Sequence, residues 1–177
     1  MCSSDLCRRC LGNRDGTHLL GRSGRQKEQG MSVHFSRQSD EWETPKDLFN
    51  KLHAEFNFTL DPCATAETRK CARWFGVAHN GLEHDWHQET VFVNPPYSDL
   101  RAWIKKAHSA SIKGATVVML IPARTDTKAF HQYIWDQKRH CPRPWVEVRF
   151  LQGRLKFGSA TNSAPFPSMI AVFRTPQ

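Results

Sequence analysis

The sequence predicts an α/β protein with one mostly parallel sheet, helices on both faces of that sheet, and antiparallel strands at its C-terminal end. Two observations lead to this fold class. The apolar segments 90–93 and 115–121 are separated by apolar residues at helical spacing, which is the strand, helix, strand order of a parallel sheet. The last strand-like segments follow each other without a helix between them, which is typical of antiparallel strands.

The first helix is predicted to start at Thr44 and Pro45, with Thr44 as the N-cap and Pro45 at the first helical position. Apolar residues at 48, 49, 52 and 56 share one face of it. The short apolar stretch 58–60 follows as a strand, which Asp61 and Pro62 end.

The later elements are read from β-branched runs, helical spacing and turn residues. The stretch 90–93 is β-branched and aromatic, and 115–121 is apolar except at one position, as in a strand buried on both faces. Gln152 and Gly153 offer a tight turn. The expected elements are a strand at 90–93, a helix at 100–111, a strand at 115–121, a short helix at 130–134, a hairpin of 146–150 and 154–157, and a last strand at 168–173.

The composition agrees with one globular domain. The 177 residues include 25 Lys and Arg against 17 Asp and Glu, a net charge of +8, and 39% are apolar. No apolar run approaches the roughly 20 residues of a membrane span, and the first 30 residues lack the apolar core of a signal peptide. We therefore expect a cytoplasmic protein without a membrane partner.

Residues 1–30 differ from the rest of the chain. They contain no aromatic residue, whereas residues 31–177 carry all six Trp and all eleven Phe, so we expect one folded domain at 31–177. Two interpretations of the leader stay open. It is an unstructured tail, or it is upstream sequence before a true start at Met31, because Lys27 and Glu28 can be encoded by a purine-rich ribosome-binding site. The intact mass of the native protein distinguishes the two.

Polar residues follow two of the predicted strands, at the place where a parallel sheet binds its ligands. Ligands bind beyond the carboxyl ends of such strands, near the point where the strand order reverses. Asp61-Pro62-Cys63-Ala64 follows one strand, and Asn94-Pro95-Pro96-Tyr97 follows the next. The sequence contains neither GxGxxG nor GxxxxGK[ST], which disfavours dinucleotide and nucleoside triphosphate chemistry.

The residues Asn94 to Tyr97 suit recognition of a flat amine. The Asn94 amide supplies one acceptor oxygen, and the Pro95 carbonyl, which no strand ladder uses, supplies a second. Two adjacent acceptors match a planar amino group with two N–H donors. Tyr97 adds an aromatic face on which a flat ring can stack.

NPPY at the end of a strand resembles the catalytic motif of S-adenosylmethionine-dependent amino-methyltransferases, and residues 42–173 resemble the small phage and prophage DNA N6-adenine methyltransferases. Five motifs carry this resemblance: Glu41-Trp42-Glu43-Thr44-Pro45, Leu60-Asp61-Pro62-Cys63-Ala64, Gly81-Leu82 with Asp85-Trp86, Val93-Asn94-Pro95-Pro96-Tyr97-Ser98, and Gly153-Arg154-Leu155-Lys156-Phe157-Gly158. The resemblance implies a Rossmann-like methyltransferase fold. It also implies methyl transfer from S-adenosylmethionine to an adenine flipped out of double-stranded DNA, without a metal.

The resemblance further assigns roles to residues. Asn94, Pro95, Pro96 and Tyr97 would be catalytic. Asp61 would bind the ammonium group of the cofactor, directly or through water, and Asp85 would accept a hydrogen bond from the amino group of the cofactor's adenine. The full set expected to bind the cofactor is Trp42, Thr44, Pro45, Asp61, Pro62, Cys63, Asp85 and Trp86. The stretch 74–79 has no acidic residue for the ribose hydroxyls, so the ribose ligand is left unassigned.

Contacts to DNA phosphates are expected from Arg124, Lys128, Arg154 and Lys156. No separate recognition domain fits between the elements, so base readout must come from short loops, and we expect modest sequence specificity. Three alternatives stay open: methylation of RNA, methylation of a protein glutamine, and a catalytically inactive DNA-binding relic. The nine His show no metal spacing, and we expect a monomer or weak oligomer.

Overall fold

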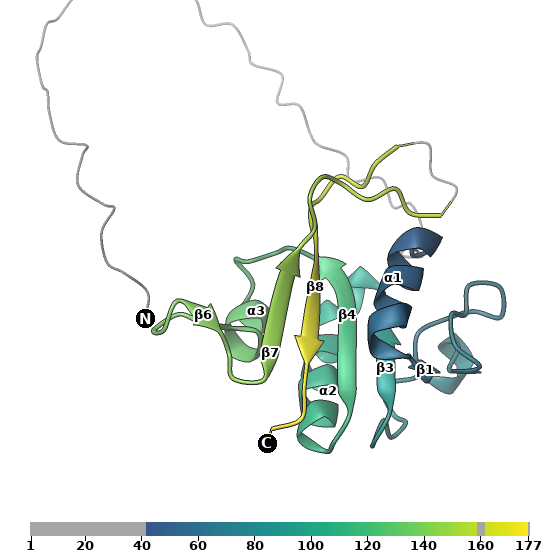
Figure 1. Cartoon of the computed structure of the whole chain (residues 1–177), viewed down its shortest axis with the longest axis horizontal. Coiled ribbons are helices and arrows are strands. Elements are labelled where there is room, and N and C mark those ends of the chain that lie inside the picture. Colours follow the sequence, from purple (N-terminus) through teal and green to yellow (C-terminus); the bar gives the residue numbers. More distant parts are fainter. Residues whose placement is uncertain (1–41, 159–161, 177) are drawn as a thin grey trace, which may run out of the picture. The chain divides into compact units, whose positions relative to one another are not determined.

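The structure is a computed structural model that describes residues 42–158 and 162–176. The two interpretations of residues 1–30 lie outside these described residues. A six-stranded sheet in the order β2-β1-β3-β4-β8-β7 forms the centre of the domain (Figure 1). Its strands are β1 (Leu60–Asp61), β2 (Arg73–Trp74), β3 (Thr90–Val93), β4 (Thr116–Pro122), β7 (Val146–Phe150) and β8 (Ser168–Phe173).

The first four strands of the sheet are parallel and the last two run antiparallel to their neighbours. β1 pairs in parallel with β2 and β3, and β3 pairs in parallel with β4. β8 pairs antiparallel with β4 on one side and with β7 on the other. The predicted mostly parallel sheet with antiparallel C-terminal strands is confirmed. A separate two-stranded sheet consists of β5 (Trp135–Asp136) and β6 (Cys141–Pro142).

Helices cover both faces of the sheet, as predicted. α1 (Lys46–Phe56) places Phe49 and Leu52 on one face, in a core cluster with Phe92 of β3 and with β4 and β8 residues. α2 (Leu100–Ile112) and α3 (Lys128–Tyr133) pack on the other face through Trp103 and Phe130 (Figure 1). Two short 3₁₀ helices, η1 (Val77–His79) and η2 (Tyr97–Asp99), follow β2 and β3.

Two local predictions are wrong. α1 begins at Lys46 with Pro45 at its N-cap and without a side-chain cap, because the Thr44 hydroxyl accepts instead from Asn94. Residues 154–157 form no strand of a hairpin with 146–150, because β7 finds its partner in β8 and 151–158 runs outside the ladder. Within 42–158 and 162–176, no helix has the length and apolar character to cross a membrane.

Candidate active site at the carboxyl edge of the sheet

The strand order reverses at β1 and β3, and a cavity of about 610 Å³ lies beyond their carboxyl ends. From β1 the chain moves outward to β2, whereas from β3 it moves to β4 on the other side, so the two connections diverge and leave a crevice. The cavity volume is within the range of about 300–1,000 Å³ that small-molecule sites have. Three of the segments that line it are residues 42–44 before α1, residues 61–65 at the end of β1 and beyond, and Asn94 with Pro96 after β3.

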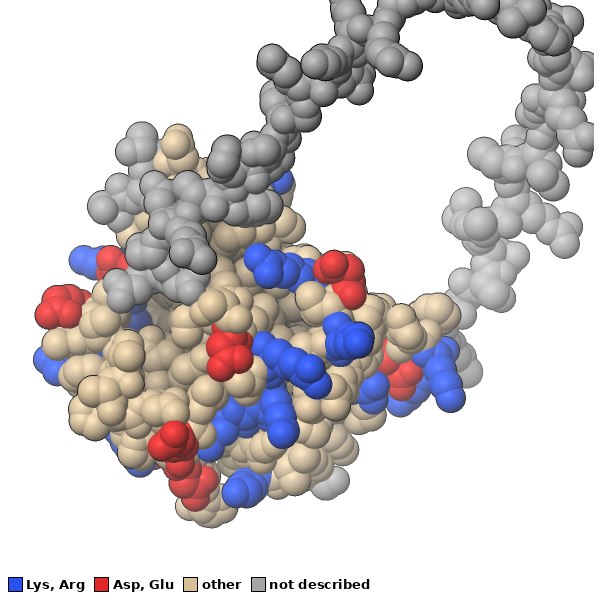
Figure 2. All heavy atoms as spheres, turned by 180° about the vertical axis from the view of Figure 1, so that it is seen from behind, with Lys and Arg blue, Asp and Glu red and all other residues tan. Residues whose placement is uncertain are grey.

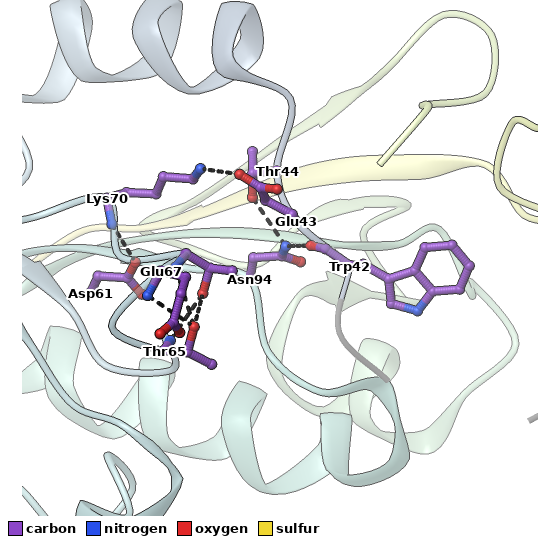
Figure 3. A network of polar contacts seen from close by, with 9 residues as sticks. Trp42, Glu43, Thr44, Asp61, Thr65, Glu67, Lys70 and Asn94 are labelled. Atoms are coloured by element: carbon purple, nitrogen blue, oxygen red, sulfur yellow. Dashed lines mark hydrogen bonds and ion pairs between the residues drawn. The ribbon is translucent and has the colours of Figure 1, made fainter. Parts of the chain in front are cut away.

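The Asn94 side chain is oriented by the segment 42–44. Its amide nitrogen donates to the Trp42 carbonyl oxygen and, at 3.0 Å, to the Thr44 hydroxyl oxygen (Figure 3). A carbonyl oxygen only accepts, so the amide turns its nitrogen toward this segment and its Oδ1 away from it. The Tyr97 hydroxyl lies 3.4 Å from that Oδ1. Asn94 therefore offers the cavity an acceptor of fixed orientation.

The residues after Asn94 leave the sheet at once. The ladder between β3 and β4 ends at Val93 and Met119, so the Pro95 carbonyl lies outside it. Pro96 lines the cavity, and Tyr97 starts η2. Burial raises the pKa of the Tyr97 phenol above its ordinary value, which keeps the hydroxyl neutral and able to donate.

Asp61 places a second polar group, a buried carboxylate, in the wall of the cavity. Its Oδ2 accepts from the Lys70 backbone N–H at 3.0 Å and its Oδ1 from the Cys63 backbone N–H at 3.5 Å (Figure 3). Burial raises its pKa to about 6, against the opposing effect of these N–H donors. The carboxylate is thus ionised at neutral pH in a place where a cationic ligand would relieve its desolvation.

The segment 42–44 also reaches the Asp61 side of the cavity. The Lys70 ammonium group pairs with the Glu43 carboxylate at 3.1 Å, while the Lys70 backbone holds Asp61. Figure 3 shows the Trp42 carbonyl and Thr44 meeting the Asn94 amide and Glu43 meeting Lys70 beside Asp61, while the Trp42 indole points away from them. The motif around Trp42 and the two strand-end motifs, which the sequence placed far apart, therefore form one site.

Most residues expected to bind a cofactor lie around this cavity. Its lining includes Trp42, Thr44, Asp61, Pro62 and Cys63. Pro45 is adjacent, at the N-cap of α1.

Asp85 and Trp86 lie outside the lining that the described residues form. Asp85 is exposed and accepts from the His87 backbone N–H. Trp86 is fully buried, and its indole N–H donates to the Gly81 carbonyl at 3.0 Å, so it supports the loop that lines the cavity.

Sequence reasoning missed the loop 76–82 and the pair Thr65 and Thr68 as parts of the cavity wall. Val77 on this loop is 91% exposed, although Val is an apolar residue. Gly81 packs so close to the Pro62 backbone that a Cβ would lie 1.9 Å from the Pro62 carbonyl oxygen. The dipeptide Asn80-Gly81 is common in turns, and it is the sequence feature that could have predicted this loop.

Basic residues gather beside the Asn94–Tyr97 motif. Arg124 and Lys128 line a second cavity of about 230 Å³ together with Tyr97 and Arg101, a residue that sequence reasoning did not select. All three basic residues are exposed, and Figure 2 shows Lys and Arg side chains gathered on one face of the domain. Arg154 and Lys156 are exposed in the segment that follows β7, where Arg154 donates to the Ala164 carbonyl at 3.4 Å. No three His, Cys, Asp or Glu side chains among the described residues are placed to hold a metal ion.

The chain is similar to known proteins over most of its length. A family model described as DNA N-6-adenine-methyltransferase (Dam) matches residues 32–176. The chain is 29% identical over 148 residues to the DNA N-6-adenine-methyltransferase of Haemophilus phage HP1, with 81% of this chain and 84% of that protein aligned. It is 30% identical over 93 residues to the DNA N-6-adenine-methyltransferase of Escherichia phage T1, with 51% of this chain and 39% of that protein aligned.

Proposed function

Because the chain belongs to the DNA N-6-adenine-methyltransferase family, we propose that its cavity brings S-adenosylmethionine and a flipped adenine of double-stranded DNA together for methyl transfer to N6. The observation that carries this proposal is the Asn94 amide, whose nitrogen donates to residues 42–44 and whose oxygen, which accepts from the Tyr97 hydroxyl, has a second lone pair for an amine. Of the substrates considered from the sequence, the family match favours DNA over RNA or a protein glutamine.

The residues around the cavity fit S-adenosylmethionine. The ammonium group of its amino acid end would meet the buried Asp61 carboxylate, and its flat adenine would meet the apolar wall of Pro62, Val77 and Leu82. The cofactor supplies an electrophilic methyl group whose bond electrons stay with sulfur. Trp86 would support the loop 76–82 through its bond to the Gly81 carbonyl, and the exposed Asp85, which lies outside the cavity lining, is given no cofactor role.

The Asn94 oxygen and the Pro95 carbonyl would accept the two hydrogens of the adenine amine. An exocyclic amine is a poor nucleophile because the ring withdraws its lone pair, and two acceptors return electron density to nitrogen. N6 would gain the methyl carbon and lose one proton to water. The chain contributes chiefly position and electrostatic stabilisation.

Incubation of the protein with unmethylated DNA and labelled S-adenosylmethionine, followed by nucleoside analysis, tests the proposal. We expect N6-methyladenine in DNA, and neither labelled RNA nor labelled protein in parallel reactions. DNA binding that is unaffected by cofactor, without any transfer, would indicate the relic instead. Since both compared relatives come from phages, we place the reaction in the cytoplasm of a bacterial host.

The basic residues beside Tyr97 would hold the DNA backbone while the base enters the site. Arg101, Arg124 and Lys128 surround the smaller cavity next to the catalytic motif, a position suited to phosphates flanking an extruded nucleotide. Arg154 and Lys156 lie in the segment 151–158, and we propose that they extend this contact.

Replacing Arg124 and Lys128 together by Gln is expected to weaken DNA binding uniformly across sequences. Each lost phosphate contact reduces the slope of log K against log salt by about 0.9, so the double variant should lose nearly 2 units of slope. Titration of labelled duplex at several salt concentrations measures this. Lys138→Gln, on the exposed turn between β5 and β6, is the matched control and should keep the wild-type slope. An unchanged slope in the double variant would show that Arg124 and Lys128 do not contact DNA phosphates.

Cofactor affinity is expected to fall as the pH drops through about 6, because protonation of Asp61 removes the charge that attracts the ammonium group.

Folding stability should change in the opposite direction. The pKa of Asp61 is raised from 3.8 to about 6 in the folded state, so its contribution to stability is greatest below pH 4 and is lost as the pH rises through 6. That difference corresponds to about 3 kcal/mol.

Calorimetric titration with S-adenosylhomocysteine between pH 4.5 and 7.5 checks the affinity. Asp61→Asn should bind weakly at pH 7.5 and show a flat profile, since an amide does not titrate in this range. An Asp61→Asn profile as steep as that of the wild type would assign the pH dependence to another group.

A further inference from the structure

The strand β7 is the outermost strand of the sheet, and among the described residues its outer edge pairs with no other strand. Figure 1 shows β7 at the end of the sheet away from β1, beside β8. An unpaired edge presents backbone N–H and C=O groups on which the strand of another chain can pair. The sequence and the hydrogen bonds of β7 indicate which strand fits there.

The ladder between β7 and β8 fixes which residues of β7 face outward. The Leu151 N–H donates to the Ser168 carbonyl at 3.1 Å, and the Arg174 N–H donates to the Trp145 carbonyl at 2.8 Å. In an antiparallel ladder, every second residue directs both its N–H and its C=O at the neighbouring strand. The odd-numbered residues of β7 therefore face β8, and the even-numbered residues direct their backbone groups away from it.

The outward backbone groups belong to Val146, Val148 and Phe150. The Val146 N–H donates to the Arg143 carbonyl at 3.0 Å, within the turn that leads into the strand. Within 42–158 and 162–176, no group binds the N–H or C=O of Val148 or Phe150. The centre of the edge is thus ready to pair, and Val148 is its middle residue.

The middle of β7 also carries one charge of each sign. The Arg149 guanidinium donates to the Glu147 carboxylate at 2.5 Å and to both oxygens of Glu55 on α1. Glu147 accepts in addition from Arg174 at 2.9 Å. The cluster of two acids and two bases is neutral, and the Glu147 and Arg149 side chains stay 39% and 34% exposed. A partner strand can therefore reach both charges.

A second copy of β7, running antiparallel, complements these charges. With Val148 opposite the partner's Val148, the free amide groups face each other and Glu147 lies opposite the partner's Arg149. The same pair forms a second time by symmetry, so the four charges alternate in sign around a square. A shift to either adjacent register places Glu147 opposite the partner's Glu147, or Arg149 opposite the partner's Arg149, and like charges in these positions repel. Charge therefore selects the register centred on Val148.

The other face of β7 agrees with this register. Val146 and Val148 pack against the core of their own chain, whereas the Phe150 side chain is 61% exposed. An exposed large apolar residue on an edge strand is a feature that monomeric sheets avoid. Opposite the partner's Val146, the Phe150 ring would lose part of its contact with water.

We propose that β7 is a dimerisation strand, which pairs antiparallel with β7 of a second copy in the register centred on Val148 and joins the two six-stranded sheets. The contact is small, so the dimer should be weak and dissociate in the micromolar range. The strands β8 and β4 separate β7 from β3, so each copy keeps its own cavity. The inference does not depend on the proposed function.

Sedimentation velocity of the full chain, over a range of micromolar concentrations, tests the proposal. The wild type should pass from monomer to dimer as the concentration rises. Glu147→Arg and Arg149→Glu each create two pairs of like charges per dimer, so each variant alone should associate about tenfold more weakly or worse. In an equimolar mixture of these two variants, one strand carries two positive charges and the other two negative charges. Every cross-strand pair is then attractive again, and a mixed dimer should form.

Two single variants complete the test. Phe150→Lys should weaken association without lowering the melting temperature, because the ring is exposed in the single chain. Lys138→Glu, a charge reversal on the exposed turn between β5 and β6, should associate like the wild type. Methyl transfer per chain should be the same in every variant, and its absence from the wild type would count against the proposed function alone.

Three results would overturn the dimer. They are a wild type that stays monomeric throughout the range, a dimer that neither charge reversal weakens, and a mixture that stays monomeric although both variants melt cooperatively. Should a charge variant fail to fold, Phe150→Lys decides, and association as strong as that of the wild type would refute the proposal.

Discussion

Asn94→Ala should lower the rate of methyl transfer by about 10³-fold or more while cofactor affinity changes only slightly. Removing one well-placed hydrogen-bonding group from a polar transition state typically costs 10²–10³ in rate, and Asn94 has a second task in fixing the segment 42–44. The methyl acceptor would lose the partner that restores electron density to N6. Asp61, which we propose to bind the cofactor, keeps both of its backbone donors in this variant.

Two further variants separate the acceptor oxygen from the support it receives. Asn94→Asp keeps an acceptor oxygen but presents a second oxygen to the Trp42 carbonyl, which cannot donate, whereas the Thr44 hydroxyl can turn and donate. We therefore expect an intermediate rate, above that of Asn94→Ala. Thr44→Val removes one support and should reduce the rate by less than Asn94→Ala does.

Single-turnover rates with saturating labelled S-adenosylmethionine, together with calorimetric affinity for S-adenosylhomocysteine, measure these effects. A normal rate in Asn94→Ala would contradict the role proposed for the amide. A parallel loss of cofactor affinity would show that the variant disturbs the whole cavity, and the intermediate rate of Asn94→Asp would then be absent.

The buried strands and the NPPY motif were readable from sequence because each depends on neighbouring residues. β4 is apolar along nearly its whole length and is buried on both faces, and two prolines end β3. The position of Asp61 and Asn94 at one edge followed from the parallel order of the strands alone. A local sequence pattern predicts the folded structure correctly when no distant residue forms a contact that replaces the local one.

Predictions failed where a distant partner replaced the local one. Thr44 has the sequence context of an N-cap, but its hydroxyl binds Asn94, a residue 50 positions away. Residues 154–157 were expected to pair with 146–150, yet β8 supplies the longer antiparallel partner for β7. Arg101 was overlooked because nothing in the sequence around it shows that η2 turns the start of α2 toward Arg124.

Gly81→Ala should damage both stability and cofactor binding, because Gly81 is the place where the loop 76–82 touches the turn after β1. A Cβ at this position would lie 1.9 Å from the Pro62 carbonyl oxygen and 2.9 Å from its carbonyl carbon. These are backbone atoms, so the Asp61-Pro62 turn or the loop must move. Overpacking of this kind costs about 1–3 kcal/mol, or about 3–10 °C in melting temperature for a domain of this size.

The displacement should reach the cofactor site because Asp61 directly precedes the residue that is pushed, so we expect at least tenfold weaker binding of S-adenosylhomocysteine. Gly153→Ala is the control. Gly153 has φ +75°, and no atom lies within 4 Å of the position that a Cβ would take there, so Ala adds backbone strain of about 1–2 kcal/mol without a steric contact. It should lower the melting temperature but leave cofactor affinity unchanged. If Gly81→Ala melted and bound like the wild type, the contact between the loop 76–82 and Pro62 would not shape the cavity, and the cofactor would have to be held mainly by the segments 42–44 and 61–65.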